Sequence, residues 1–262
     1  MTERLQRKLD EALEATGERA AAAREATVAG LESAGERLAE VRAAAEDLGA
    51  KVKPRLRGVI HEYAFFVSLA LGAALVSLAS GSEARIAAGI YVFSLSALLG
   101  TSALYHRINW KSPDVRRWVR RLDHSMIFVL IAGTVTPFAM LVIEGPFATA
   151  VLITAWAAAL AGIIVELIWL EAPKYVSAIV YVTVGLVGAI GFPPILVEAG
   201  LGAGLLVATG GAIYGLGAVV YARQSPNPSP GVFGYHEVFH VMVVVAAALH
   251  FAAVALYAVP IR

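Results

Sequence analysis

The residue types best suited to chemistry stand in one short segment, His236-Glu237-Val238-Phe239-His240, where the last apolar run of the sequence begins. Two histidines four residues apart project from the same side of a helix, so a helix here offers two imidazole ligands to a metal ion such as zinc. Because the sequence contains no cysteine, further ligands must be histidine or carboxylate side chains from elsewhere in the chain. The alternative interpretation is that both histidines are interfacial polar residues at a helix end.

The composition indicates that a membrane protein positions these residues. Of the 262 residues, 58% are hydrophobic, which is far more than in a soluble domain of this length. Charge is unevenly distributed, since 22 of the 41 charged residues lie in the first 57 positions. The formal net charge of +1 gives no reason to expect a nucleic-acid partner. We therefore expect a charged cytoplasmic arm, residues 1–57, followed by one membrane domain, residues 58–262.

The arm is rich in Ala, Glu and Arg, and its apolar residues recur every three or four positions from Leu31 to Val52. This spacing is typical of an amphipathic helix or a weak coiled coil, through which the chain would self-associate. Glycines, small alanines in the apolar seam and glutamates at i+4 spacing argue against a stable helix. A solvated and partly disordered arm is therefore an equal alternative.

Seven apolar runs follow the arm, and each is close to the ~20 residues that cross a hydrocarbon layer ~30 Å thick. They cover approximately residues 59–80, 86–106, 122–143, 147–169, 174–196, 201–222 and 236–258. The fold class we predict is all-α, a seven-transmembrane helix bundle with an N-terminal amphipathic helical arm. Two connections, 107–121 and 223–235, are long, and the fifth run is expected to end at Phe192-Pro193-Pro194.

The distribution of lysine and arginine between connections predicts the orientation of the bundle. With the N-terminus inside, the outer segments contain only Arg85 and Arg262. The inner segments contain twelve basic residues, namely Lys51, Lys53, Arg55, Arg57, Arg107, Lys111, Arg116, Arg117, Arg120, Arg121, Lys174 and Arg223. We therefore expect a multi-pass protein of the cell (inner) membrane with a cytoplasmic N-terminus and an external C-terminus.

This topology brings polar residues from three separate runs to one membrane depth. His106 ends the second run, Asp123 opens the third, and His236 and His240 open the seventh, all on the inner side. Ser102 lies one helical turn from His106 on the same face. Ionisable groups in or near hydrocarbon are costly and usually mark function, so this level of the bundle is the predicted site.

Other polar residues in the runs allow weaker interpretations. His250 lies ~15 Å along the helix from His240, and we interpret it as a hydrogen-bonded packing residue. His61 stands at the depth of the site. It could equally bind the metal ion directly or contact a metal ligand or a lipid headgroup. His124 points about 100° away from Asp123 and is left out of the site. Glu166 is either a buried functional acid or an interfacial residue.

Three segments together resemble the signatures of the haemolysin III family, which belongs with the seven-helix progestin and adipoQ receptors. They are Ser102-Ala103-Leu104-Tyr105-His106, the run from Asp123-His124 to Thr134-Val135-Thr136-Pro137, and His236-Glu237-Val238-Phe239-His240. The resemblance covers about residues 58–259 and excludes the arm. Val135 stands where the family usually has tyrosine.

The resemblance implies a zinc ion held by His106, His236 and His240. It also implies that Asp123 holds the water bound to that ion and that Ser102 lies beside the site. Three protein ligands with one open position are the pattern of catalytic zinc, in which the pKa of bound water drops to about 7.

Three functions compete for such a site. The first is a zinc-dependent hydrolase of membrane lipid, and the receptor relatives imply an amide-linked, ceramide-like substrate. The second is a pore-forming or channel-type cytolysin, or a membrane sensor, with structural zinc, although the apolar middles of the runs do not support a wide polar pore. The third is an intramembrane metalloprotease, because His236-Glu237-x-x-His240 fits the H-E-x-x-H pattern with Glu237 as general base. The chain lacks the Asp-Gly pair that such a protease would also require.

Overall fold

The computed structural model confirms an all-α membrane domain. The chain divides into two units, Met1–Lys53 and Pro54–Arg262. The structure describes residues 54–169 and 172–261 and, in the N-terminal unit, residues 24, 30, 31, 33–35, 37 and 38. The predicted amphipathic or self-associating arm therefore falls largely outside the described residues. In the part that is described, seven helices are long and apolar enough to cross a membrane, which confirms a multi-pass membrane protein.

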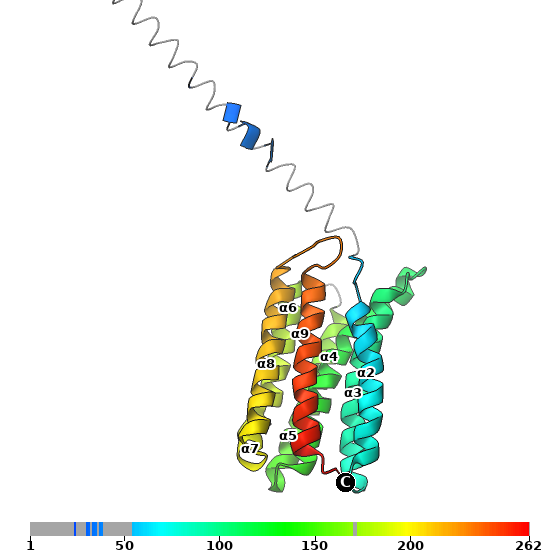
Figure 1. Ribbon diagram of the computed structural model, residues 1–262, viewed down its shortest axis with the longest axis vertical. Helices are drawn as coiled ribbons and strands as arrows, with labels where there is room; N and C mark the ends of the chain where they lie inside the picture. Colours follow the sequence, from blue (N-terminus) through cyan, green and yellow to red (C-terminus); the bar gives the residue numbers. More distant parts are fainter. Residues whose placement is uncertain are drawn as a thin grey trace, which may run out of the picture. The chain divides into compact units, whose positions relative to one another are not determined.

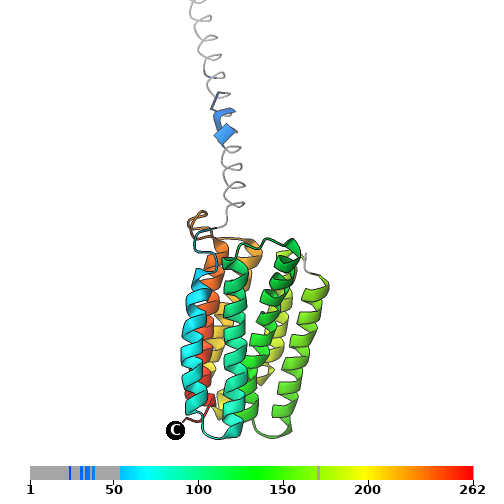
Figure 2. The same ribbon diagram turned by 90° about the vertical axis from the view of Figure 1, so that its right-hand side faces the viewer.

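The seven spans follow the chain order as antiparallel neighbours, and their connections are short except for the one between α8 and α9 (Figure 1, Figure 2). The first four are α2 (Val59–Leu78), α3 (Ser82–Arg107), α4 (Pro113–Leu141) and α5 (Gly145–Ile168). The fifth joins α6 (Lys174–Gly188), η1 (Ala189–Gly191) and α7 (Phe192–Glu198). The last two are α8 (Gly200–Arg223) and α9 (Tyr235–Ala253), which continues into η2 (Val254–Ala258).

Helix α4 begins at Pro113 rather than near residue 122, so most of the predicted 107–121 loop is helical. Ser112 is the N-cap, and its side chain accepts a hydrogen bond from the Val115 backbone N–H at 3.4 Å. Pro113 occupies the first helical position, where a missing N–H costs nothing. Asp123 therefore lies well inside a continuous helix, which fixes the direction of its side chain.

The expected end of the fifth span at Phe192-Pro193-Pro194 was wrong. The helix is interrupted earlier, at η1, and the two prolines lie in the first turn of α7. Proline is compatible with the first turn because the N–H groups there have no intrahelical acceptor. Helix therefore resumes, and the span extends to Glu198.

Helices α3 and α4 form the centre of the bundle. Of their most apolar segments, 56% and 50% of the residues are buried, compared with 17% for the span Lys174–Glu198. Large apolar side chains such as Phe66, Phe93 and Leu186 remain exposed on the outer surfaces, where a membrane protein contacts lipid. The two central helices are also the ones that carry Ser102, His106 and Asp123.

Backbone hydrogen bonds connect the segments that flank α2 and α9 at both ends of these helices. Near their beginnings, Arg55 and Leu56 donate backbone hydrogen bonds to the carbonyls of Gly231 and Val232, both at 3.2 Å. At the other end, the Ser80 backbone N–H donates to the Pro260 carbonyl at 2.8 Å. These contacts fix the relative height of α2 and α9, and they thereby set which residues of the two helices meet.

Candidate metal centre

Three histidines from two helices converge at the end of the bundle where α2 begins. His106 comes from the last turn of α3, and His236 and His240 come from the start of α9. Each offers one ligand atom, and these atoms all lie within 4.8 Å of one another. The Nε2 atoms of His106 and His236 are 3.1 Å apart. The cluster can therefore hold a metal ion, at the positions that the motifs predict.

The start of α9 sets the direction of its two histidines. Gly234 is the N-cap, and its N–H donates to Glu237 Oε2 at 2.8 Å. The other carboxylate oxygen of Glu237 pairs with Arg57, which precedes α2. Because this arrangement begins the helix at Tyr235, His236 and His240 share one face. Glu237 itself is fully buried in these contacts.

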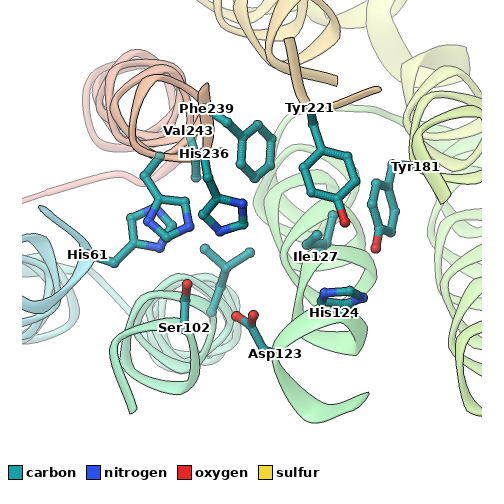
Figure 3. A pocket seen from close by; sticks show the side chains of 12 residues that line it. His61, Ser102, Asp123, His124, Ile127, Tyr181, Tyr221, His236, Phe239 and Val243 are labelled. Atoms are coloured by element: carbon teal, nitrogen blue, oxygen red, sulfur yellow. The ribbon is translucent and has the colours of Figure 1, made fainter. Parts of the chain in front are cut away.

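Asp123 and Ser102 lie beside the three histidines. Asp123 Oδ2 is 3.7 Å from His106 Nε2, which is too long for a direct hydrogen bond and suitable for a bridging water. Ser102 and Asp123 are both buried and lie on neighbouring walls of one cavity (Figure 3). The five residues predicted for the site are thus close together in space.

His61 lies against one of the three histidines. Its ring stacks on that of His240, with centroids 3.8 Å apart and planes 7° from parallel. Neither of its ring nitrogens has a hydrogen-bond partner among the described residues. Of the alternatives for His61, this geometry corresponds to contact with a candidate metal ligand, His240.

The cavity shown in Figure 3 contains about 430 Å³ of open space, counting its mouth. It has a polar layer and an apolar layer, each supplied by the same three helices. Ser102, Asp123 and His240 line the polar layer, and residues one helical turn further into the bundle line the apolar layer, namely Leu98, Ile127 and Val243.

A family model described as haemolysin-III related matches residues 50–251. The chain belongs to this family. It is 30% identical to Hemolysin-3 of Bacillus cereus over 180 residues, which cover 68% of this chain and 78% of that protein. It is 31% identical to the human monocyte to macrophage differentiation factor over 202 residues, which cover 74% of this chain and 80% of that protein. The resemblance predicted from three motifs is thereby confirmed.

In this haemolysin III-related chain, two further histidines have separate surroundings. His250 Nε2 donates to the Val207 carbonyl at 3.1 Å, and a side chain at Gly210 would meet the His250 ring. The interpretation of His250 as a hydrogen-bonded packing residue is confirmed. His124, in contrast, lines the cavity, although sequence reasoning had left it out.

His124 Nδ1 lies 2.6 Å from Glu166 Oε1 on α5. The sequence contains a signal for this pair, because an ionisable residue inside a membrane span needs a polar partner. The sequence positions of His124 and Glu166 do not by themselves identify the two residues as partners. Glu166 is buried in this contact, which excludes the interfacial interpretation of that residue.

Proposed function

We propose that this haemolysin III-related protein is a zinc-dependent hydrolase of an amide-linked membrane lipid. We further propose that its site lies near the cytoplasmic face of the cell (inner) membrane, as the basic residues of the connections favour. The observation that carries the proposal is a cluster of three histidines with a buried carboxylate 3.7 Å from one of them, in a cavity between membrane-spanning helices.

The donor set fits zinc. Neutral imidazoles are ligands that zinc accepts readily, and three of them leave one position open. The 3.1 Å between the Nε2 atoms of His106 and His236 is close to the roughly 3.3 Å that a tetrahedral ion with bonds of ~2.0–2.1 Å requires. His240 Nδ1 is buried without a hydrogen-bond partner among the described residues. A bound cation would satisfy nitrogen atoms that face one another at this distance.

His106, His236 and His240 would hold the zinc ion, which would supply Lewis-acid chemistry that makes water nucleophilic near neutral pH. Asp123 lies where it can accept a proton from that water as general base. In hydrolysis of an amide, the oxygen of water replaces nitrogen on the carbonyl carbon, and Asp123 would give the proton it has accepted to the leaving amine. Ser102 offers a hydroxyl on the neighbouring wall to orient the reacting group. Burial of Asp123 keeps bulk water away from this exchange.

The two layers of the cavity support an amphiphilic substrate. A lipid that enters between helices can place its polar amide among Ser102, Asp123 and the histidines. Its hydrocarbon can then extend along Leu98, Ile127 and Val243, one turn deeper. The amide linkage is the part of the proposal that rests on the resemblance to the receptors.

The test compares metal content and lipid turnover in two variants of the full chain, purified in detergent. We expect His106→Ala to lose both zinc and turnover because a ligand is missing. We expect Asp123→Asn to keep zinc and lose about 10²-fold or more in turnover, since the general base is removed. Zinc is measured by elemental mass spectrometry, and hydrolysis of N-acyl sphingosine is followed by lipid mass spectrometry. Equal turnover in Asp123→Asn and wild type would contradict the proposal.

A cytolysin or channel with structural zinc is the second candidate, and the name of the relative Hemolysin-3 favours it. Dye leakage from liposomes that survives replacement of all three histidines by alanine would support this function.

A metalloprotease is disfavoured because both carboxylate oxygens of Glu237 are occupied. One accepts the Gly234 N–H and the other pairs with Arg57. Glu237 is thus engaged in contacts at the helix start, and Asp123 is the carboxylate beside the histidines.

A further inference from the structure

A second polar group lines the cavity, and the reaction described above does not use it. His124 of α4 and Glu166 of α5 are joined at 2.6 Å, and their side chains are only 13% and 6% exposed. A carboxylate that accepts the Nδ1–H of a histidine fixes the orientation and tautomer of the ring, and it leaves Nε2 for another partner. The pair therefore presents a positioned imidazole on the cavity wall.

Close packing of α4 on α5 fixes this pair. One turn from His124, Phe128 lies against Gly162, where an added Cβ would come within 2.5 Å of the Phe128 ring. Gly162 is itself one turn from Glu166. Because only glycine allows the two helices to approach at this level, the next turn brings His124 and Glu166 into hydrogen-bond distance.

Helix α6 adds an unpartnered hydroxyl beside the pair. The ring of Tyr181 lies 5.2 Å from that of Phe128, centroid to centroid. Its hydroxyl oxygen is buried and has no hydrogen-bond partner among the described residues, and Figure 3 shows it on the same side of the cavity as His124. A buried tyrosine hydroxyl usually finds a partner, and leaving it unpaired is costly. A ligand in the cavity would supply that partner.

The charges around this wall restrict the ligand. Two acidic residues are close to His124, because Glu166 is bonded to its ring and Asp123 precedes it in α4. No lysine or arginine is found among the described residues that line the cavity. Arg120, one turn from His124, acts electrostatically on Asp123 and Tyr181 but does not line the cavity. A phosphorylated headgroup would therefore meet acidic side chains on the wall itself, whereas a neutral hydroxyl can hydrogen-bond to both imidazole and phenol.

We propose that His124, held by Glu166, and Tyr181 form a subsite that hydrogen-bonds a neutral hydroxyl headgroup of the lipid. Asp123 and His124 are consecutive residues of α4, about 100° apart around the helix. A lipid with its amide at Asp123 therefore has its neighbouring headgroup atoms within reach of His124 and Tyr181. This inference rests on the proposed function for the amide-linked class of substrate.

The test measures binding in the full chain carrying Asp123→Asn, so that hydrolysis does not consume the probe. The probes are N-acyl sphingosine, its 1-deoxy analogue without the primary hydroxyl, and its 1-phosphate, each presented in detergent micelles of the same composition. Added Tyr181→Phe removes only the hydroxyl and keeps the ring that packs on Phe128. Added His124→Ala removes the imidazole.

The matched control is Tyr91→Phe. Tyr91 also has a buried hydroxyl without a partner among the described residues, but it does not line the cavity. The comparison therefore separates the loss of any buried hydroxyl from the loss of this one.

We expect Tyr181→Phe and His124→Ala each to weaken N-acyl sphingosine binding about five- to tenfold, as removal of one hydrogen bond would. Binding of the 1-deoxy analogue should be unchanged by Tyr181→Phe, and Tyr91→Phe should affect neither lipid. The 1-phosphate should bind at least tenfold more weakly than N-acyl sphingosine. Equal losses for both lipids in Tyr181→Phe, no loss at all, tighter binding of the 1-phosphate, or no binding of N-acyl sphingosine would each overturn the proposal.

The two proposals can fail separately. Suppose that lipid binding depends on the hydroxyl and on Tyr181, but that the wild type hydrolyses no lipid. This result would support the subsite and contradict the hydrolase. Turnover that requires Asp123, together with lipid binding that does not depend on the hydroxyl, would support the hydrolase and contradict the subsite.

Discussion

The two ends of the seven-helix bundle are formed by the same helices, but among the described residues metal-binding side chains cluster at one end alone. Where α2 begins, His236 and His240 of α9 meet His106 of α3 beside a cavity. Further along α9, the His250 ring packs against α8, where it contacts the Val207 carbonyl, the Tyr214 ring and the backbone near Gly210. Histidines on one helix thus have different roles.

The difference lies in what the neighbouring helices leave open. Around His250, a glycine lets α8 close onto the imidazole, so the space is filled by protein. Around His236 and His240, the neighbouring side chains leave a cavity and contribute polar groups from several other helices. A histidine in a membrane span is therefore a candidate ligand only where its neighbours leave room for an ion or a substrate.

The largest difference between the two ends is expected when the histidines themselves are replaced. We expect His240→Ala to abolish stoichiometric zinc binding and to lower turnover by about 10³-fold, because an open ligand position lets the ion escape. His250→Ala should keep the full zinc content, since its contact is one hydrogen bond in a packed region. Elemental mass spectrometry of both proteins, purified in parallel, provides the measurement. Zinc loss in His250→Ala would contradict the division between the two ends.

Two glycines with positive φ, one at each end of the bundle, allow the backbones of the two ends to be compared. Gly58, at φ +81°, precedes α2, and an added Cβ would lie 2.6 Å from His106 Cβ. Gly81, at φ +90°, precedes α3 at the other end and has open space around it. Both alanine variants pay backbone strain of about 1–3 kcal/mol. Only Gly58→Ala also displaces His106.

We therefore expect Gly58→Ala to lower both the melting temperature and the zinc affinity. Gly81→Ala should lower the melting temperature alone. Thermal unfolding in detergent and competition with a chelator measure the two quantities. Equal zinc affinities for the two variants would show that the approach of Gly58 to His106 does not matter.

The smallest effect on turnover is expected at Glu237. It can be compared with Asp123, the other carboxylate near the three histidines. Glu237→Gln weakens the contacts with Arg57 and the start of α9, which should cost about 1–3 kcal/mol of stability. Turnover should stay within a few-fold of wild type, because Glu237 does not line the cavity. Asp123→Asn should have the opposite profile. Loss of turnover in Glu237→Gln with full activity in Asp123→Asn would revive the metalloprotease.

Much of the fold follows from local properties of the sequence. Seven spans are expected because each apolar run is long enough to cross the hydrocarbon, and the described part of the chain contains seven. Their ends were harder to predict. Capping at Ser112 and proline at position 113 continue α4 outside the apolar run, and prolines 193 and 194 begin a helix instead of ending one. Hydropathy reports membrane contact, whereas helix ends depend on hydrogen bonds of the first and last turns.

The proximity of the candidate residues was also predicted in part. His106, Asp123 and His236 stand at the ends of their runs, so the alternation of spans places them at one depth, and they are found together. His124 and Glu166 were not connected, because depth alone does not say which faces of α4 and α5 meet. Their pairing depends on the approach of the two helices at Gly162.

The sequence by itself determined the class of protein, the number of spans and the level at which polar groups gather. These properties depend on composition along the chain, and the alternation of membrane spans converts position in the sequence into depth. Only the tertiary structure decided which of those groups face one another across the cavity. Facing depends on the rotation of each helix about its axis, which is set by close contacts between helices that are distant in sequence.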